Sequence, residues 1–340
     1  MPELSLVVTV RNDRAGLQEL LPALEAQTVA PAELIVVDGG SVDGTLEVLR
    51  EWTTDRFPVR VELEPGSNIA QGRNAAVRLA SCEWIACTDA GCRPDPGWLA
   101  ALSAAAEEAD IVAGVFVAEG RTPFEEIASL THYPVPEELD GASPLVEASH
   151  RLFGRDFRGH QAGGRSMAFS KAAWEAAGGF PDVQYAGEDL AFTAAVLERG
   201  FRSTLAEDAV IRWRPPATWR ATALMFFTYC RGDVRSPPRL RHLLRVVAWT
   251  LGPLLAVRAG RRGRVAVAGA ALAYCGLPVH RARRAQVALR HWWRIPAAVA
   301  VKDVSQILGA AAGIADAVRG APQPNPHPAP AHAPGAPITS

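Results

Sequence analysis

Short runs of strand-forming residues alternate with helical stretches over the first 116 residues of this 340-residue chain. Residues 4–10 form an apolar run typical of a buried strand, and residues 15–27 repeat leucine at helical spacing. This alternation predicts an α/β fold, Rossmann-like, in which a mostly parallel sheet carries helices on both faces. The same patterns predict strands at 34–38, 59–63, 84–88 and 111–116, and helices through 46–49, 69–80 and 98–106.

Two aspartates stand where predicted strands end. Asp38 closes the second strand, and Asp89 directly follows the fourth. Because ligands bind outside the carboxyl ends of strands in an open parallel sheet, we expect both carboxylates at one binding edge. A carboxylate near a glycine, as in Asp89 and Gly91, suits a divalent cation that bridges a diphosphate, since Mg²⁺ usually takes one or two protein carboxylates plus phosphate oxygens. From these residues alone, Asp38 and Asp89 would also fit strand-to-helix turns with good caps.

The chain after residue 116 is less regular. Residues 117–160 are punctuated by proline and glycine and lack periodicity, which predicts a loop-rich segment over the sheet edge. A compact part resumes at 163–169, and a helix with an acidic first turn is predicted at 188–199. Two short strands are predicted at 203–206 and 209–213.

The net charge of −1 conceals a strong asymmetry. Residues 1–210 carry 16 basic and 33 acidic side chains, a net charge of −17, whereas residues 211–340 carry 19 basic and 3 acidic side chains, a net charge of +16. An asymmetry of this size predicts that the second part meets a phosphate-rich surface, either nucleic acid or an anionic membrane leaflet.

Two uncharged apolar runs, 246–257 and 265–279, flank an arginine cluster at 258–264. Each run is shorter than the roughly 20 residues of a standard span, so we expect two short or tilted helices that form a hairpin or lie in the membrane interface. The alternative is a soluble helical subdomain with a basic exterior. Both runs are too apolar for a surface that follows phosphates, which argues against nucleic acid as a partner.

The five cysteines do not form an even disulfide framework or a CxxC pair, and residues 1–10 do not resemble a signal peptide. These features predict a reducing, cytoplasmic compartment. Residues 321–340 contain seven prolines and no formally charged side chain, which predicts a disordered tail.

Six short motifs follow one another in a recognisable order. They are DGGSVDGT at 38–45, GRN at 72–74, TDAG at 88–91, GGRSMAF at 163–169, GGF at 178–180 and GED at 187–189. Over residues 4–233 this order resembles the family 2 glycosyltransferases with the GT-A fold. The resemblance implies inverting transfer of a sugar from a nucleotide-diphosphate sugar to an acceptor hydroxyl, on a glycolipid or an envelope polysaccharide precursor. It also implies a GT-A catalytic domain at 1–233 and a basic, apolar, membrane-associating helical region at 234–320.

The resemblance also implies roles for individual residues. Asp189 matches the family's general base, with Glu188 beside it, and Asp89 matches the first aspartate of a metal motif that would hold Mg²⁺ or Mn²⁺. Gly91 stands where the second aspartate of that motif would be. Acceptor-side positions are Gly163, Gly164 and Arg165. Donor-nucleotide positions are Thr9, Arg11, Asn12, Asp38, Arg73, Asp89 and Arg231, with Thr9 in place of a common proline.

Other interpretations of these residues stay open at this point. Asp189 would also suit an acidic helix start, and Arg73 a solvated helix surface. Arg231 would also suit lipid headgroups. A nucleotidyltransferase would need a glycine-rich loop with lysine after the first strand, which residues 9–13 do not offer. A catalytically inactive scaffold at the membrane is the non-enzymatic alternative, motivated by Gly91. The leading hypothesis names as partners a nucleotide-sugar donor, a carbohydrate or lipid-linked acceptor and an anionic membrane surface, on the cytoplasmic face of the cell membrane.

Overall fold

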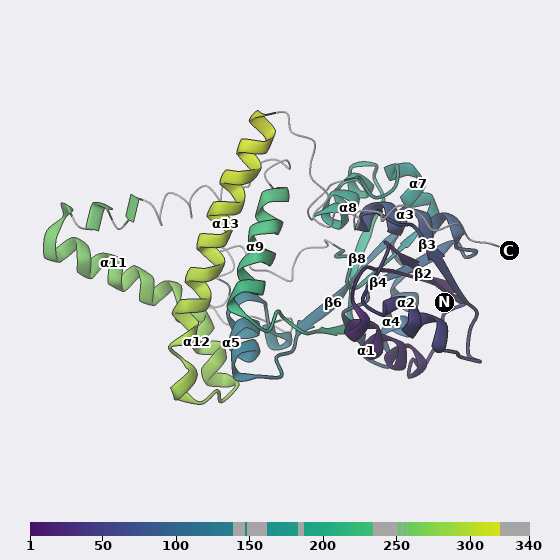
Figure 1. The fold of residues 1–340 in the computed structure, drawn as a ribbon, viewed down its shortest axis with the longest axis horizontal. Coiled ribbons are helices and arrows are strands. Elements are labelled where there is room, and N and C mark those ends of the chain that lie inside the picture. The colour runs from purple at the N-terminus through teal and green to yellow at the C-terminus, as the bar shows by residue number, and fades with distance from the viewer. Residues whose placement is uncertain are drawn as a thin grey trace, which may run out of the picture. The chain divides into compact units, whose positions relative to one another are not determined.

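The structure is a computed structural model that describes residues 1–138, 147, 162–182, 187–233, 251–252, 254–256 and 258–319 (Figure 1). It divides into two compact units. Unit 1 comprises residues 1–115, 160–211 and 321–340, and unit 2 comprises residues 116–159 and 212–320. The predicted domain boundary after residue 233 and the predicted tail at 321–340 stay predictions, the tail lying outside the described residues.

An eight-stranded sheet, counted over the described residues, has the strand order β3-β2-β1-β4-β7-β6-β8-β5. The four strands from β3 to β4 are parallel, as predicted. The sheet is mixed beyond β4, because β7 lies between β4 and β6 and runs antiparallel to both. The strands are β1 Leu4–Val10, β2 Glu33–Asp38, β3 Val59–Leu63, β4 Trp84–Asp89, β5 Cys92–Pro94, β6 Ile111–Ala118, β7 Met167–Ser170 and β8 Ser203–Trp213.

Three helices of unit 1, α1, α3 and α7, begin at side-chain caps. Asp13 accepts a hydrogen bond from the backbone N–H of Gly16 at the start of α1, and Asn68 forms a capping box with Gln71 at the start of α3. These caps follow strand ends directly, which fixes where the chain turns back over the sheet. The helices are α1 Arg14–Glu25, α2 Thr45–Glu51, α3 Ile69–Leu79, α4 Trp98–Ala105, α7 Lys171–Ala177 and α8 Glu188–Glu198.

The core of unit 1 lies between the sheet and helices α3, α7 and α8. Buried aliphatic side chains from β1, β2 and β4 meet three phenylalanines. Phe180 and Phe192 have ring centroids 4.3 Å apart, and Phe169 packs edge-on against both. This aromatic cluster supports α8, so the acidic start of that helix rests on a well-packed base.

Two expectations about the middle of the chain are wrong. Part of the segment predicted as loops is α5, Pro123–His132, followed by a 3₁₀ turn, η1 Pro136–Glu138. Thr122 and Glu125 form a capping box, and Pro123 takes the first helical position, so residues that suggested a loop begin a helix instead. The two strands predicted after residue 202 are the single strand β8. The exposed residues 207–208 interrupt the apolar pattern of the sequence, but the backbone continues through them as one strand.

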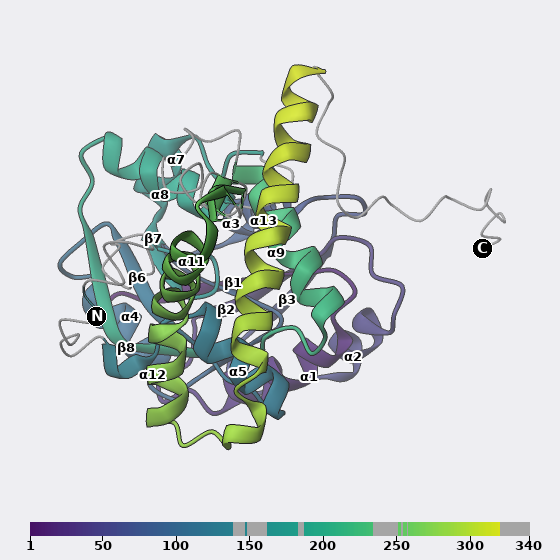
Figure 2. The ribbon, with the colours of Figure 1, turned by 90° about the vertical axis from the view of Figure 1, so that its left-hand side faces the viewer.

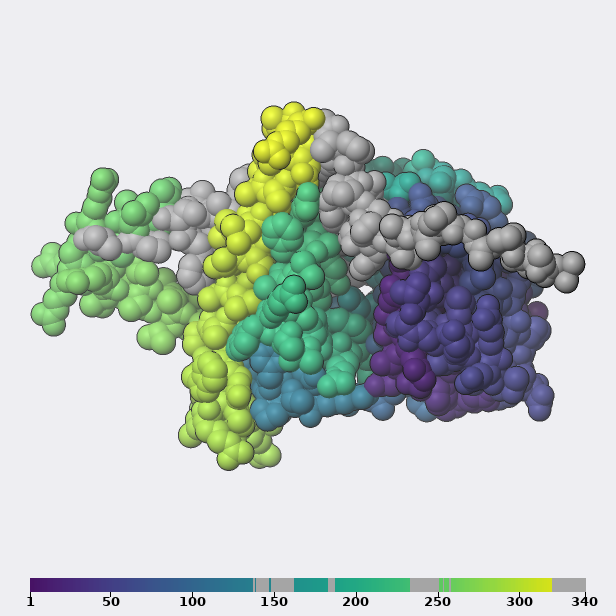
Figure 3. Space-filling model, in the orientation of Figure 1, coloured from purple at the N-terminus to yellow at the C-terminus, as the bar shows by residue number. Residues whose placement is uncertain are grey.

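Unit 2 is helical. Helix α13, Arg294–Val318, lies along α9, Trp219–Asp233, and also packs on α5 (Figures 1 and 2). In Figure 3 α13 is yellow and α9 is green, and the two touch along their length. Arg281 donates to the carboxylate of Glu138 and to the carbonyl oxygens of Leu130 and Tyr133, which ties α12, Gly276–Arg284, to the end of α5.

The basic C-terminal region contains one helix long and apolar enough to cross a membrane, Leu289–Val318, within the described residues. Lys302 and Asp303 are buried near its middle, and Lys302 lies 5.3 Å from the ring of Phe226, which indicates a helix that packs in a protein bundle. Helix α11, Gly260–Tyr274, differs because none of its residues is buried, and it meets α12 at a 40° bend. The other predicted apolar run, 246–257, lies mostly outside the described residues.

Candidate active site

Parallel pairing brings the predicted site aspartates to one edge of the sheet in unit 1. Thr9 on β1 is in register with Asp89 on β4, and Val10 is in register with Asp38 on β2. Because neighbouring strands lie about 4.8 Å apart, the two aspartates flank β1 at a backbone separation of roughly 10 Å. The edge is the one formed by the carboxyl ends of the parallel strands.

Asp38 is fully buried and uses one carboxylate oxygen to organise the turn that follows it. Its Oδ1 atom accepts hydrogen bonds from the backbone N–H groups of Gly40, at 2.8 Å, and Ser41, at 2.7 Å. Its Oδ2 atom and the hydroxyl of Thr9 are buried and have no partner among the described residues. Because unsatisfied buried polar atoms are costly, this pair marks a position that a ligand or water would satisfy.

The loop after β1 is joined to the loop after β2 by Asn12. The Oδ1 atom of Asn12 accepts from the N–H of Val42, and its own N–H donates to the hydroxyl of Ser41, both at 2.8 Å. Asn12 has a φ of 52°, a left-handed conformation that asparagine tolerates better than most residues. Arg11 packs on the turn, with its Cδ atom 3.4 Å from where a Cβ atom of Gly39 would lie. Asn12 and Arg11 therefore shape the wall beside Asp38.

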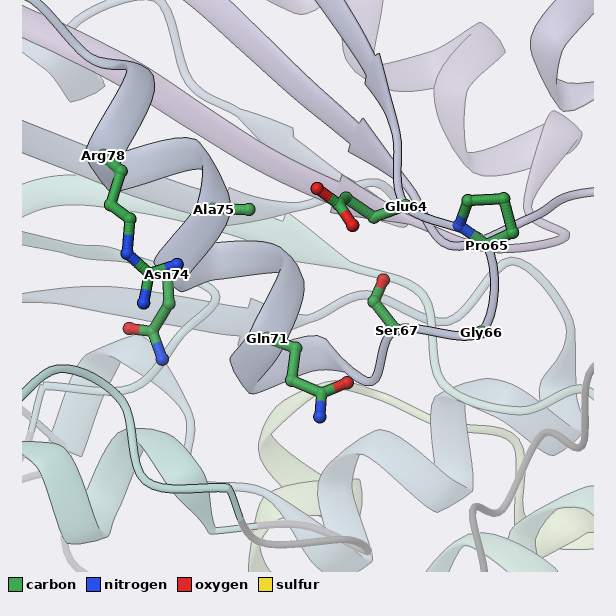
Figure 4. A pocket seen from close by; sticks show the side chains of 8 residues that line it. All are labelled: Glu64, Pro65, Gly66, Ser67, Gln71, Asn74, Ala75 and Arg78. Atoms are coloured by element: carbon green, nitrogen blue, oxygen red, sulfur yellow. The ribbon is translucent and has the colours of Figure 1, made fainter.

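A groove of about 420 Å³ lies between the loop of residues 64–67, which follows β3, and one face of α3 (Figure 4). Figure 4 shows Glu64 and Ser67 facing Gln71 and Asn74 across it. None of the predicted site residues lines this groove.

Arg73 is the centre of the polar cluster at the other side of β1. Its side chain is 1% exposed, and its Nη1 atom lies 2.5 Å from Oε1 of Glu188 while Nη2 lies 2.7 Å from Oδ1 of Asp89. The guanidinium also stacks 5.5 Å from the ring centroid of Phe180. The helix residue predicted to meet the donor is thus an internal bridge between the end of β4 and the start of α8.

The predicted base, Asp189, is half-buried at the first turn of α8. Its Oδ2 atom accepts from the N–H of Gly164 at 2.7 Å, and its Oδ1 atom accepts from the N–H of Leu190 at 2.8 Å. Burial raises the pKa of the neighbouring Glu188 above its ordinary value, with Arg73 opposing this and Asp189 adding to it. The two adjacent carboxylates therefore have different surroundings: Glu188 is enclosed, and Asp189 is held by backbone N–H groups.

The three predicted acceptor-side residues form a tight turn next to Asp189. Gly163 pairs with Ser166 in an isolated bridge, and the carbonyl oxygen of Arg165 accepts from the hydroxyl of Thr88 at 2.8 Å. A Cβ atom at Gly164 would lie 2.1 Å from Nη2 of Arg73, so only glycine fits this position. The turn therefore touches both Arg73 and Asp189.

Arg231 is the predicted donor residue that belongs to unit 2. It lies on α9, where its Nε atom is 2.7 Å from Oδ2 of Asp316 on α13, and its guanidinium lies 6.0 Å from the ring of Phe227. The other predicted site residues all belong to unit 1. A role for Arg231 at the donor stays a prediction.

The residues at the sheet edge fit a divalent cation that is held mainly by a donor. The side chain of Asp89 is 30% exposed, and Arg73 occupies only its Oδ1 atom, which leaves Oδ2 for a cation. The described residues contain no group of three or more His, Cys, Asp or Glu side chains that could hold a metal by themselves. Such a site suits Mg²⁺ or Mn²⁺ that takes one carboxylate and several phosphate or water oxygens.

Asn74 is a site-supporting residue that sequence reasoning did not single out. Its Oδ1 atom accepts from the N–H of Phe180 at 2.8 Å and from the indole N–H of Trp174 at 3.0 Å, and its Nδ2 atom donates to the carbonyl oxygen of Phe180 at 2.8 Å. These bonds fix the GGF turn against α3. The signal was present in the sequence, because Asn74 follows Arg73 in a helix whose other inward residues are small or apolar.

Comparison with known proteins gives a consistent result. Residues 5–171 match the model of glycosyl transferase family 2. The chain is 26% identical over 219 residues to the glycosyltransferase AglE of Haloferax volcanii, covering 62% of this chain and 66% of that protein. It is 34% identical over 146 residues to validoxylamine A glucosyltransferase of Streptomyces hygroscopicus subsp. limoneus, covering 41% of this chain and 32% of that protein. The matches thus span one third to two thirds of these relatives.

A solved structure shares the fold over nearly the whole chain. It is the mannosyltransferase PcManGT from Pyrobaculum calidifontis in complex with GDP-Man and Mn²⁺, with a TM-score of 0.55 and 21% identity, covering 93% of this chain and 88% of that one. The family match, the two relatives and the shared architecture agree with the motif order and with the sheet edge described above. Residues 5–171 form a glycosyl transferase family 2 domain, and the chain has the GT-A fold.

Proposed function

We propose that this protein transfers a sugar from a nucleotide-diphosphate sugar to an acceptor hydroxyl, with inversion at the anomeric carbon and with Asp189 as the general base. The observation that carries the proposal is that the buried cation of Arg73 joins Asp89 to Glu188 at the ligand-binding edge of the sheet, with Asp189 next to Glu188 and held by the N–H of Gly164. The chemistry needs one carboxylate beside the leaving diphosphate and another that takes a proton from the attacking hydroxyl.

The donor nucleotide is assigned to the wall beside Asp38. The buried Oδ2 atom of Asp38 is an acceptor without a partner among the described residues, and the Thr9 hydroxyl is a second unpaired polar group on the adjacent strand. An acceptor-only carboxylate suits a nucleobase that offers ring N–H groups. Arg11 and Asn12 form the adjoining loop, so the base and ribose are expected there.

The diphosphate and a divalent cation are assigned to Asp89. When bound, Mg²⁺ or Mn²⁺ would neutralise charge that develops on the leaving diphosphate. Asp89 would hold the cation through Oδ2 while Arg73 keeps Oδ1 in place. PcManGT was solved with Mn²⁺ and a nucleotide sugar, which supports a divalent cation for the same fold.

Asp189 has the geometry expected of a base that must keep its orientation. Backbone N–H groups hold both of its oxygens, and each carboxylate oxygen has a second lone pair for an incoming hydroxyl. The acceptor is assigned to the turn of Gly163, Gly164 and Arg165, because Gly164 donates directly to Asp189. A carbohydrate or lipid-linked hydroxyl is the expected acceptor class.

We place the activity at the cytoplasmic face of an anionic membrane. Helix α11 supports this, because it starts beside an arginine cluster and exposes Val265 and Leu272. Vesicles with and without phosphatidylglycerol would test it by flotation. The full chain is expected to float only with the anionic vesicles, and Leu272→Asp should weaken that binding; equal binding to neutral vesicles would contradict the assignment.

Gly91, in place of a second metal-motif aspartate, favours one alternative, a catalytically inactive scaffold with the same fold. Calorimetric titration with UDP and GDP, with and without Mn²⁺, separates the two. The proposal predicts binding of one nucleotide that strengthens with Mn²⁺, followed by release of that nucleotide from the matching sugar donor in a panel screen. Failure to bind any nucleotide would favour the scaffold.

A further inference from the structure

We infer that Arg73 is a positioning residue that fixes Asp89 against Glu188, the residue next to the base Asp189, and that it does not touch the donor phosphates. The inference rests on the proposed function, since it describes how the two working carboxylates are held. It changes the role that the resemblance implies for Arg73, from a donor ligand to an internal bridge.

The N–H groups of Arg73 are enclosed by the protein. The side chain is 1% exposed, its Nη1 atom is bonded to Glu188 and its Nη2 atom to Asp89. Its Nε atom is buried and has no partner among the described residues, so it faces the protein interior. A phosphate that displaced Glu188 from Arg73 would leave that carboxylate buried and unpaired.

The guanidinium is also held on two sides, which prevents it from rotating outward to meet a ligand. One side stacks on Phe180, whose backbone is fixed by Asn74. Another side touches Gly164 so closely that a single added carbon would lie 2.1 Å from Nη2. Movement of Arg73 would require movement of the turn that holds Asp189.

Arg73 joins two elements that are far apart in the sequence. Asp89 ends β4, and Glu188 begins α8, 99 residues later, so without Arg73 two adjoining carboxylates would repel each other across the site. The planar fork of arginine offers two parallel donors, one for each carboxylate, whereas lysine offers a single point charge. The geometry thus predicts that lysine keeps the charge but loses the alignment.

The test compares Arg73→Lys with Arg78→Lys, a matched change on the exposed face of the same helix. GDP-mannose and UDP-glucose serve as donors, and turnover and donor KM are measured with Mn²⁺. Arg73→Lys is expected to lower kcat by about tenfold or more while donor KM and the calorimetric Kd for GDP or UDP stay within about twofold. The Arg78→Lys control should change neither. A tenfold rise in KM and Kd with kcat retained would mean that Arg73 binds the donor directly and would overturn the inference.

A second measurement does not depend on activity. Thermal unfolding of Arg73→Met, Glu188→Gln and the double variant tests the bridge, and Arg73→Lys replaces Arg73→Met if the latter does not fold. If the bridge exists, the unfolding temperature of the double variant falls by much less than the sum of the two single-variant decreases. Additive losses would refute the bridge. If the losses are coupled but the protein turns over no donor, the result supports the bridge and contradicts the proposed function.

Discussion

Gly164→Ala is the substitution for which the structure sets the clearest expectation. The added Cβ atom would lie 2.1 Å from Nη2, 2.5 Å from Cζ and 2.7 Å from Nη1 of Arg73. These are three atoms of one rigid group, and that group is held by Glu188, Asp89 and the ring of Phe180. The conflict therefore cannot be relieved by rotating the end of a flexible side chain.

The expected loss of stability follows from the two ways in which the site can respond. If the turn shifts and Arg73 keeps both carboxylates, the cost is that of overpacking, about 1–3 kcal/mol. If Arg73 is pushed off one carboxylate, the cost rises toward the roughly 3–5 kcal/mol of a broken buried ion pair. With a urea m-value of about 3 kcal/mol/M, a loss of 2 kcal/mol lowers the unfolding midpoint by roughly 0.7 M.

Urea unfolding followed by circular dichroism measures this change, with Gly163→Ala as the matched control. A Cβ atom at Gly163 would meet only Oδ2 of Asp189, at an ordinary 3.7 Å, so this variant should stay within about 0.5 kcal/mol of the parent. Gly164→Ala should also reduce turnover, because the same turn holds Asp189. If Gly164→Ala were as stable as Gly163→Ala, the packing around Arg73 described here would be wrong.

Two further predictions concern charge and thiol chemistry. Burial alone would raise the pKa of Glu125, but hydrogen bonds from Arg214 and from backbone N–H groups lower it, so its contribution to stability is present above about pH 4.5 and is lost as the pH falls through the lowered value. Urea midpoints should therefore fall more steeply below pH 5 in the parent than in Glu125→Gln, and equal slopes would contradict this. Burial raises the pKa of Cys87 and Cys92 to about 12. Iodoacetamide at pH 8 should therefore modify the half-buried Cys82 of the native protein but not these two thiols, and mass spectrometry measures the modification. Their modification without unfolding would count against the packing of β4 and β5.

The first half of the sheet could be predicted from the sequence because each βαβ step is local. The strands that end at Val10 and Asp38 carry continuous apolar runs, and helices α1 and α3 start at recognisable side-chain caps. The antiparallel insertion of β7 could not be predicted in the same way. Its pairing with β4 joins Cys87 to Met167, 80 residues apart, and nothing in the local pattern of a four-residue strand sets its direction.

Contacts in the candidate site also depend on residues that are far apart in the sequence. Motif order identified Asp38, Asp89 and Asp189, and the structure joins Asp89 through Arg73 to Glu188, the neighbour of Asp189. An arginine on a helix suggests a solvated or phosphate-binding group, however, and the burial of Arg73 depends on Glu188, 115 residues later. The loop prediction failed at residues 123–132 for a different reason, because Pro123 is both a common loop residue and a favoured first residue of a helix.

The most direct test of the account is turnover by Asp189→Asn, with Asp208→Asn, an exposed carboxylate on β8, as the matched control. Asparagine keeps the shape of the side chain and can still accept one of the two backbone hydrogen bonds, but it cannot take a proton from the acceptor. Release of nucleotide from the sugar donor and calorimetric binding of the free nucleotide are measured together. The account predicts that Asp189→Asn binds the nucleotide like the parent and loses turnover by about a hundredfold or more, while Asp208→Asn keeps both. Full turnover by Asp189→Asn would contradict the account.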